Sequence, residues 1–125
     1  MINRSTESNV NVPVAYKGNQ TFIWYKKEIE ALLDKGPFDG IAIKHNENVQ
    51  SCYTKLQDTM FFDCIATIVA LEHNIKVKSY VYKQLQTNAQ GVLNLAENLV
   101  GKTDTHWDKG IADAIVAANY LLKEL

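Results

Sequence analysis

The chain has 125 residues, enough for one domain with a sizeable hydrophobic core and too few for two. Its 46% hydrophobic and 22% charged residues are an ordinary globular mixture, and the net charge of −1 excludes a strong overall attraction to nucleic acid or anionic membrane. The thirteen basic residues include a single arginine, Arg4, so strong base-specific readout is not expected. We expect a flexible tail over residues 1–10 and a single domain over 11–125.

The cysteines and the N-terminus bear on the cellular compartment. Cys52 and Cys64 lie on one predicted helix, where twelve residues span about 18 Å, too far for a disulfide between them. Neither has the cysteine or histidine neighbours of a metal site. The N-terminus is polar rather than signal-like, and no apolar run reaches the length of a membrane span. The sequence predicts a cytoplasmic protein with no membrane partner.

The first half of the domain predicts three strands and a helix. Residues 12–16 and 21–25 are short, apolar and rich in β-branched or aromatic side chains, which indicates two strands joined by a turn. Apolar residues at helical spacing then predict a helix over 26–35, which a Gly-Pro pair ends. The compact apolar run over 38–44 is typical of a buried central strand.

The second half predicts three helices and one strand. A helical pattern covers 49–74, and the alternating residues 75–82 then predict a strand parallel to the preceding one, because a helix connects the two. A short helix over 92–100 ends at a glycine, and the last helix runs from about residue 108 to the end. Strands that alternate with helices indicate an α/β layer fold with a mixed sheet.

Asp113 is the acidic residue whose position most needs an explanation. It lies among Ala and Ile on a helix that is apolar almost all round, and a charge removed from water needs a partner or a metal. Ligands of α/β sheets usually bind beyond the carboxyl ends of the strands. We therefore expect Asp113 to share one cleft with the ends of two strands, namely Tyr16 and Lys17, and Lys44 and His45.

This layout resembles the ribonuclease-H-like fold, and especially the RuvC-type Holliday junction resolvases. Residues 14–19 also resemble the opening of a small uncharacterised family with the same predicted fold. The resemblance spans roughly residues 12–122 and implies a three-layer α/β fold, with a mixed sheet of about four to five strands and helices on both faces. It rests on four segments: a first strand and turn at 14–18, a central strand at 38–44, a later strand with its linker at 77–86, and a carboxylate-bearing helix at 110–114.

The resemblance also implies how the active site has changed. In the family, carboxylates gather two divalent metals beside a phosphodiester. Tyr16 and Lys44 fall where the family has an Asp and a Glu, and Gln86 falls where it has a basic residue. Gly110 replaces one acid of the last helix, so Asp113 is the one remnant of the catalytic set. Since a lysine places a cation at a metal's position, we interpret Asp113 as the ion-pair partner of Lys44 rather than as an active metal ligand.

A second acidic cluster precedes the last helix. His106, Asp104 and Asp108, with Asp113, are candidates for a replacement metal or acid–base site. A simpler interpretation makes Asp104, Thr105 or Asp108 the N-cap of the helix and leaves His106 in solvent. We expect no cofactor, except Mg²⁺ or Mn²⁺ if the chain is a nuclease. His45 and His73 are most simply exposed residues in a loop and at a helix end.

Lysines and tyrosines interleave along the strand over 75–82. Lys76, Lys78 and Lys83, with Tyr80 and Tyr82, are candidates for nucleic-acid contact, because lysines bind phosphates and aromatic rings stack on bases. Alternating lysines equally protect a strand edge from pairing with other chains. Both interpretations stay open.

An apolar stripe on the helix over 49–74 bears on oligomeric state. Met60, Phe61, Phe62 and Ile65 are most simply core residues. If some of them face solvent, the stripe would serve a two-fold homodimer, as the corresponding helix does in the resembled family.

These patterns favour a catalytically degenerate relative of the resolvases that acts as a binding or regulatory module, with nucleic acid as a candidate partner. One alternative is an active divalent-metal-dependent nuclease or junction resolvase. The other is a dimeric protein-interaction module that does not bind nucleic acid.

Overall fold

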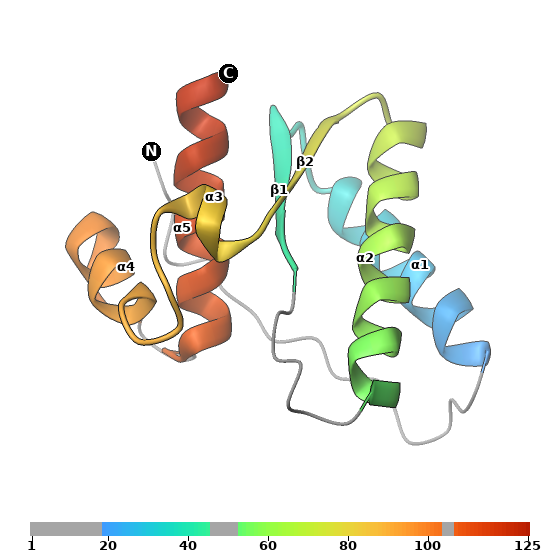
Figure 1. Cartoon of the computed structure of the whole chain (residues 1–125). Coiled ribbons are helices and arrows are strands. Elements are labelled where there is room, and N and C mark those ends of the chain that lie inside the picture. Colours follow the sequence, from blue (N-terminus) through green and yellow to red (C-terminus); the bar gives the residue numbers. More distant parts are fainter. Residues whose placement is uncertain (1–18, 46–52, 104–106) are drawn as a thin grey trace. The chain divides into compact units, whose positions relative to one another are not determined.

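The structure is a computed structural model, and it describes residues 19–45, 53–103 and 107–125, with the side chains of 53–58 left out (Figure 1). Five helices and two strands cover most of these residues. In chain order they are α1 (Gln20–Leu33), β1 (Gly40–Lys44), α2 (Tyr53–Glu72), β2 (Lys76–Tyr80), α3 (Tyr82–Leu85), α4 (Val92–Val100) and α5 (Lys109–Glu124). Among the described helices, none combines the length and the hydrophobicity of a membrane-spanning segment.

The chain divides into two compact units. The α5 unit contains residues 42–44 and 78–125, together with the undescribed residues 1–10, and the α1–α2 unit contains residues 11–41 and 45–77. Strands β1 and β2 pair in parallel as a two-stranded sheet, and each strand contributes residues to both units. This division does not test the expected single domain over 11–125, which stays a prediction.

The core of the α5 unit lies between α4 and α5, which pack side by side (Figure 1). Alanines on both helices let the two backbones approach closely, and burying the larger neighbours stabilises the pair by roughly 25 cal/mol per Å² of apolar surface removed from water. Residues of β2 and α3 close the core. Its buried members are Tyr80, Leu85, Val92, Ala96, Ala112, Ile115, Val116, Ala117 and Leu121.

Local signals fix the ends of these two helices. The Asp108 side chain accepts a hydrogen bond from the Ile111 backbone N–H at 2.9 Å, which caps the first turn of α5. At the end of α4, Gly101 takes a φ of 77°, a left-handed value that favours glycine. Asp108 is therefore the N-cap that the simpler interpretation predicts.

The core of the α1–α2 unit is a helix pair with an aromatic cluster. Leu33 on α1 and Ala66, Val69 and Ala70 on α2 are buried. Phe22 meets the rings of Phe61 and Phe62 edge to face, with centroids 5.4 and 6.1 Å apart, and Tyr25 lies tilted on Phe62 at 4.8 Å.

The prediction of a strand over residues 21–25 is wrong, because α1 already begins at Gln20. Aromatic and β-branched residues favour strands, but tertiary packing overrides that preference. Phe22 and Tyr25 are three residues apart, and that spacing places both rings on one side of a helix, where both contact Phe62. The cluster with α2 thus stabilises a helix where the local sequence indicates a strand.

The other described elements agree with the predicted ones. The helix over 26–35 is the later part of α1, the runs over 38–44 and 75–82 contain β1 and β2, and α2, α4 and α5 lie where helices were expected. The short helix α3 was not predicted. The chain is thus mixed α/β and mostly helical, with a sheet of two strands among the described residues where four to five were expected. The predicted strand over 12–16 and the tail lie outside the described residues.

Candidate functional site

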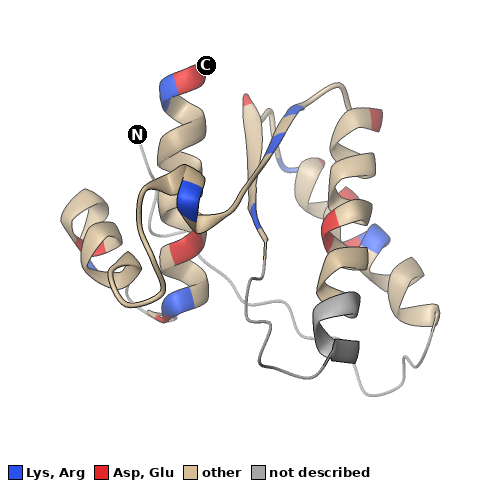
Figure 2. Ribbon diagram, in the orientation of Figure 1, with Lys and Arg blue, Asp and Glu red and all other residues tan. Residues whose placement is uncertain are grey.

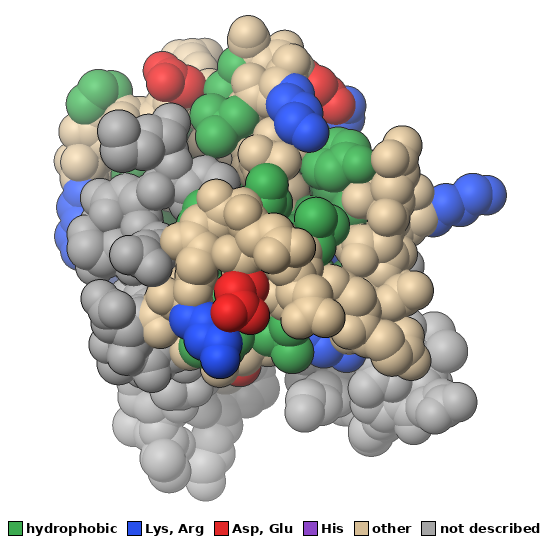
Figure 3. All heavy atoms as spheres, turned by 90° about the vertical axis from the view of Figure 1, so that its left-hand side faces the viewer, with side chains coloured by type: hydrophobic (Ala, Val, Ile, Leu, Met, Phe, Trp, Pro, Cys, Tyr) green, Lys and Arg blue, Asp and Glu red, His purple; other side chains and the backbone are tan. Residues whose placement is uncertain are grey.

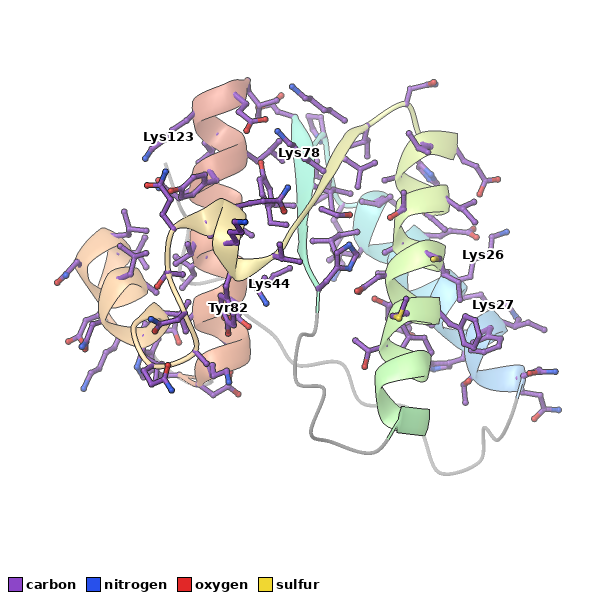
Figure 4. All side chains as sticks on the ribbon, in the orientation of Figure 1. Lys26, Lys27, Lys44, Lys78, Tyr82 and Lys123 are labelled. Atoms are coloured by element: carbon purple, nitrogen blue, oxygen red, sulfur yellow. The ribbon has the colours of Figure 1, made fainter. Side chains whose placement is uncertain are left out.

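Three side chains of the α5 unit meet around one tyrosine. Tyr82, the first residue of α3, donates a hydrogen bond from its hydroxyl to Asp113 Oδ1 on α5 at 2.8 Å. The Lys44 ammonium, at the end of β1, lies over the face of the same ring, with Nζ 3.6 Å from the centroid (Figure 4). All three residues are half-buried. Two of the expected cleft residues, Lys44 and Asp113, therefore meet at a side chain that was not expected there.

The local sequence explains why Tyr82 is held in this place. Val81 is extended, and its backbone N–H donates to Gln84 Oε1 at 2.9 Å, so the chain turns into α3 at Tyr82. Leu85, which is 1% exposed, anchors the other end of this turn in the core. Gln86 then takes a left-handed φ of 57° and ends the helix. The phenol is thus fixed from both sides.

The Lys44–Tyr82–Asp113 cluster gives a half-buried acid the partners that it needs. A hydrogen bond from a hydroxyl to a carboxylate is stronger than a hydrogen bond between two neutral groups. A cation over the face of an aromatic ring contributes about 0.5–2 kcal/mol. The Tyr82 side chain thus contacts the carboxylate at its hydroxyl and the cation on the face of its ring. A direct ion pair between Lys44 and Asp113 stays a prediction.

The other expected cleft residues lie elsewhere or outside the description. Tyr16 and Lys17 are outside the described residues. Gly110 is exposed in the first turn of α5. His45 belongs to the α1–α2 unit, where its Nδ1 lies 2.7 Å from Asp63 Oδ2 on α2. His45 is thus half-buried and bonded to a carboxylate, rather than an exposed loop residue as expected.

The acidic cluster before the last helix is described only in part. His106 and Asp104 lie outside the described residues, and the Asp108 carboxylate is used as the cap of α5. Over residues 19–45, 53–103 and 107–125, no group of three histidine, cysteine or acidic side chains is placed to hold a metal ion.

In the lysine and tyrosine stripe some side chains are exposed, and others are ion-paired or buried. Lys76 and Lys83 are exposed, whereas Lys78 pairs with Glu124 near the end of α5. Tyr80 is 2% exposed and packs edge to face on Tyr120, with centroids 6.3 Å apart. A buried ring has no free face for a base, so the stripe does not form one continuous stacking surface.

Charges of both signs alternate along the α5 unit. Figure 2 shows acids and lysines interspersed along α5, and Figure 3 shows single charged side chains scattered among hydrophobic and polar surface. The described part of this unit thus presents no block of one charge for a phosphate backbone.

The strongest departure from the expected core is on α2. Its exposed large apolar residues lie within an arc of about 100° when the helix is projected along its axis. Phe62 and Ile65 are half-buried, but Met60 and Phe61 are exposed, against their simplest interpretation as core. The exposed apolar face of α2 consists of Met60, Phe61, Cys64, Ile68 and Leu71, with exposed fractions of 57, 43, 55 and 59% for Met60, Phe61, Ile68 and Leu71.

Comparisons with known proteins assign no family to the chain. No model of a known protein family matches it, and no curated protein is significantly similar to it. The contacts of the described residues therefore carry the functional conclusion.

The Tyr82 hydroxyl and Asp113 should act as one unit in stability measurements. We expect Tyr82→Phe and Asp113→Ala each to lower the free energy of unfolding by about 1–2 kcal/mol, and the double variant to lose clearly less than their sum. Tyr82→Phe with Lys44→Met should be closer to additive, because phenylalanine keeps the ring beneath the ammonium. Urea denaturation measures these values, and additive losses for Tyr82 and Asp113 would contradict the cluster.

Tyr25 should make the chain lose stability in alkali. Burial, and then the charge of Asp63, raise the pKa of the Tyr25 phenol above its usual value of about 10. The unfolded chain therefore releases this proton first, so the stabilisation is fully present below about pH 10 and is lost as the pH rises through the folded-state pKa. Tyr25→Phe should reduce this loss, measured by denaturation along a pH series. Asp63→Asn should keep most of it, since burial is the larger cause. An unchanged slope in Tyr25→Phe would refute the assignment.

Proposed function

We propose that this protein is a non-catalytic binding module whose binding surface is the exposed apolar face of α2. One observation carries the proposal: α2 is apolar on its buried side, which holds Ala66, Val69 and Ala70, and again on the side that faces solvent. A surface helix of a globular protein normally has charged or polar residues opposite its buried stripe, and a helix that is apolar all round is normally buried. The exposed side of α2 is therefore suited to contact with another protein surface.

The composition of this face supports a contact surface. Met60, Cys64 and Leu71 recur at helical spacing, so the apolar row is continuous along the axis. Among the described residues of α2, Glu72 is the exposed charge at the edge of this arc, in the last turn. A solvated helix face would carry several charges along this length.

The size of the face sets the strength of the contact. Four large side chains, each about half exposed, present roughly 100 Å² apiece, so the face offers roughly 400 Å² of apolar surface. Two exposed residues of α1, Ile23 and Leu32, add apolar surface in the same unit. A standard interface buries about 800 Å² per partner, roughly twice the area of this face, so we expect a weak, reversible contact.

We propose a second copy of this chain as the partner. A two-fold axis brings a face against the same face of the other copy, and this face is uncharged along its middle, so dimerisation brings no like charges together there. A free thiol, Cys64, lies within the face, which suits the reducing cytoplasm that we propose as the compartment.

The relationship to ribonuclease-H-like resolvases is also a proposal. The parallel strands β1 and β2 joined through α2, followed by the carboxylate-bearing helix α5, support it. In this view the chain is a degenerate relative, because Asp113 is engaged by Tyr82 and the nearby Lys44 cation would oppose a divalent ion. Nucleic acid is the less favoured partner, since Lys78 is paired and Tyr80 is buried.

Charge placed on the face should disrupt self-association. We expect wild-type protein to show a concentration-dependent dimer in sedimentation velocity, and Ile68→Asp or Leu71→Asp to remain monomeric, because each buries a carboxylate in an apolar contact. Leu122→Asp is the matched control, since Leu122 is 46% exposed on α5, outside the face, and its substitution should leave the dimer intact.

Two results would overturn this function. A wild-type monomer at every concentration would remove the dimer. Cleavage of branched or single-stranded DNA that needs Mg²⁺ or Mn²⁺ and is lost in Asp113→Ala would establish an active nuclease instead.

A further inference from the structure

We infer that His73 and Asp34 form a binding site for a divalent transition-metal ion with the chemistry of Zn²⁺, at the point where α1 and α2 end. His73 Nε2 lies 3.9 Å from Asp34 Oδ1. Both residues belong to the α1–α2 unit, and neither is part of the exposed apolar face of α2. The site therefore does not depend on the proposed dimer.

The hydrogen bond of the His73 ring determines which of its nitrogens can bind a metal. Nδ1 lies 2.9 Å from the carbonyl oxygen of Val69, one turn earlier on α2. A carbonyl oxygen only accepts hydrogen bonds, so Nδ1 carries the proton and Nε2 of the neutral ring keeps its lone pair. Metal-binding histidines commonly donate their other ring N–H to a backbone carbonyl or a carboxylate. His73 is thus held with Nε2 as the ligand atom.

The distance between Nε2 and the carboxylate favours a metal ion between them. Both atoms are acceptors when the ring is neutral, so a cation is needed to hold them together. A proton on Nε2 would give a charged hydrogen bond of about 2.8 Å. Zinc bonds of about 2.1 Å in tetrahedral geometry place two ligand atoms about 3.4 Å apart. The observed 3.9 Å is closer to the zinc value, and the Asp34 side chain, 76% exposed, is free to rotate through the remaining distance.

The helix ends around the pair also favour a cation. Asp34 is the C-cap of α1, and His73 directly follows Glu72, the last residue of α2. Asn74 then takes a left-handed φ of 57°, as is usual just after a helix end. The carbonyl ends of both helices carry partial negative charge, which stabilises a cation. The exposed charges beside the pair, Lys35 and Glu72, have opposite signs, so the charge of Asp34 is not cancelled.

The two ligand atoms determine the class of ion. Imidazole nitrogen suits zinc, copper and nickel, whereas Mg²⁺ and Ca²⁺ prefer oxygen ligands. Over the described ranges 19–45, 53–103 and 107–125, no third histidine, cysteine or acidic side chain joins the pair, so water completes the coordination. Two protein ligands give weak, reversible binding, and the bound ion links the end of α1 to the end of α2.

Zinc titration followed by histidine side-chain NMR tests this site in the full-length chain. A Cys52→Ser/Cys64→Ala background removes the competing thiolates, and mildly alkaline buffer is used because zinc binds the unprotonated ring. Long-range ¹H–¹⁵N spectra without zinc should show His73 as the Nδ1–H tautomer. Addition of ZnCl₂ should then shift its Nε2 resonance, with one ion bound per chain.

Three variants made in this background show whether both ligands take part. We expect His73→Gln and Asp34→Asn each to weaken zinc binding at least about tenfold, measured from backbone amide shifts, because each removes a ligand. His45→Gln is the matched control, since it removes a histidine that is bonded to Asp63 instead, and it should leave the zinc affinity unchanged.

Three results would overturn the inference. The Nε2–H tautomer of His73 would show that the lone pair does not face Asp34. Zinc shifts confined to His45 or His106, or no shifts at all, would show that the pair does not bind the ion. An unchanged zinc affinity in Asp34→Asn would remove the carboxylate from the site. Asp34→Asn changes an exposed side chain by one atom, so it decides the question even if His73→Gln does not fold.

Discussion

The constraint on which the proposed binding role depends is that α2 is apolar on two sides. One side holds the buried residues Ala66, Val69 and Ala70. The opposite side holds Met60 and Leu71 in contact with solvent. Removing that surface from water is favourable in proportion to its area, so an apolar second face is stabilised by a partner and not by exposure. The proposed binding role follows from this one imbalance.

The α5 unit has the opposite feature: a charged side chain lies on an otherwise apolar helix. Asp113 lies on a helix whose neighbours Ala112 and Val116 are fully buried. The hydroxyl of Tyr82, which lies 31 residues earlier in the sequence, donates a hydrogen bond to this carboxylate. The Lys44 ammonium lies over the face of the same ring. A carboxylate held in this way contributes to the position of α3 against α5. We therefore propose a structural role for Asp113 and a binding role for the α1–α2 unit.

Much of the helix and strand order could be predicted from the sequence, because apolar spacing and glycine stops are local signals. Residues 21–25 could not, since the contact of Phe22 and Tyr25 with Phe62 decides their conformation and lies far along the chain. Tyr82 was missed at the site for the same reason, although its place directly after a predicted strand was an available signal. The sequence also does not indicate which side of α2 is exposed, because a helix without a polar face has no local signal for its buried side.

The most direct test of a dimer through α2 is the reactivity of the Cys64 thiol as a function of protein concentration. In a Cys52→Ser variant, Cys64 is the one remaining cysteine and lies within the exposed apolar face of α2. We predict rapid alkylation in dilute protein and a rate that falls several-fold as the concentration passes through the dissociation constant of the dimer, with Ile68→Asp restoring the rapid rate. A rate that is the same at every concentration would contradict the claim that a second copy covers this face.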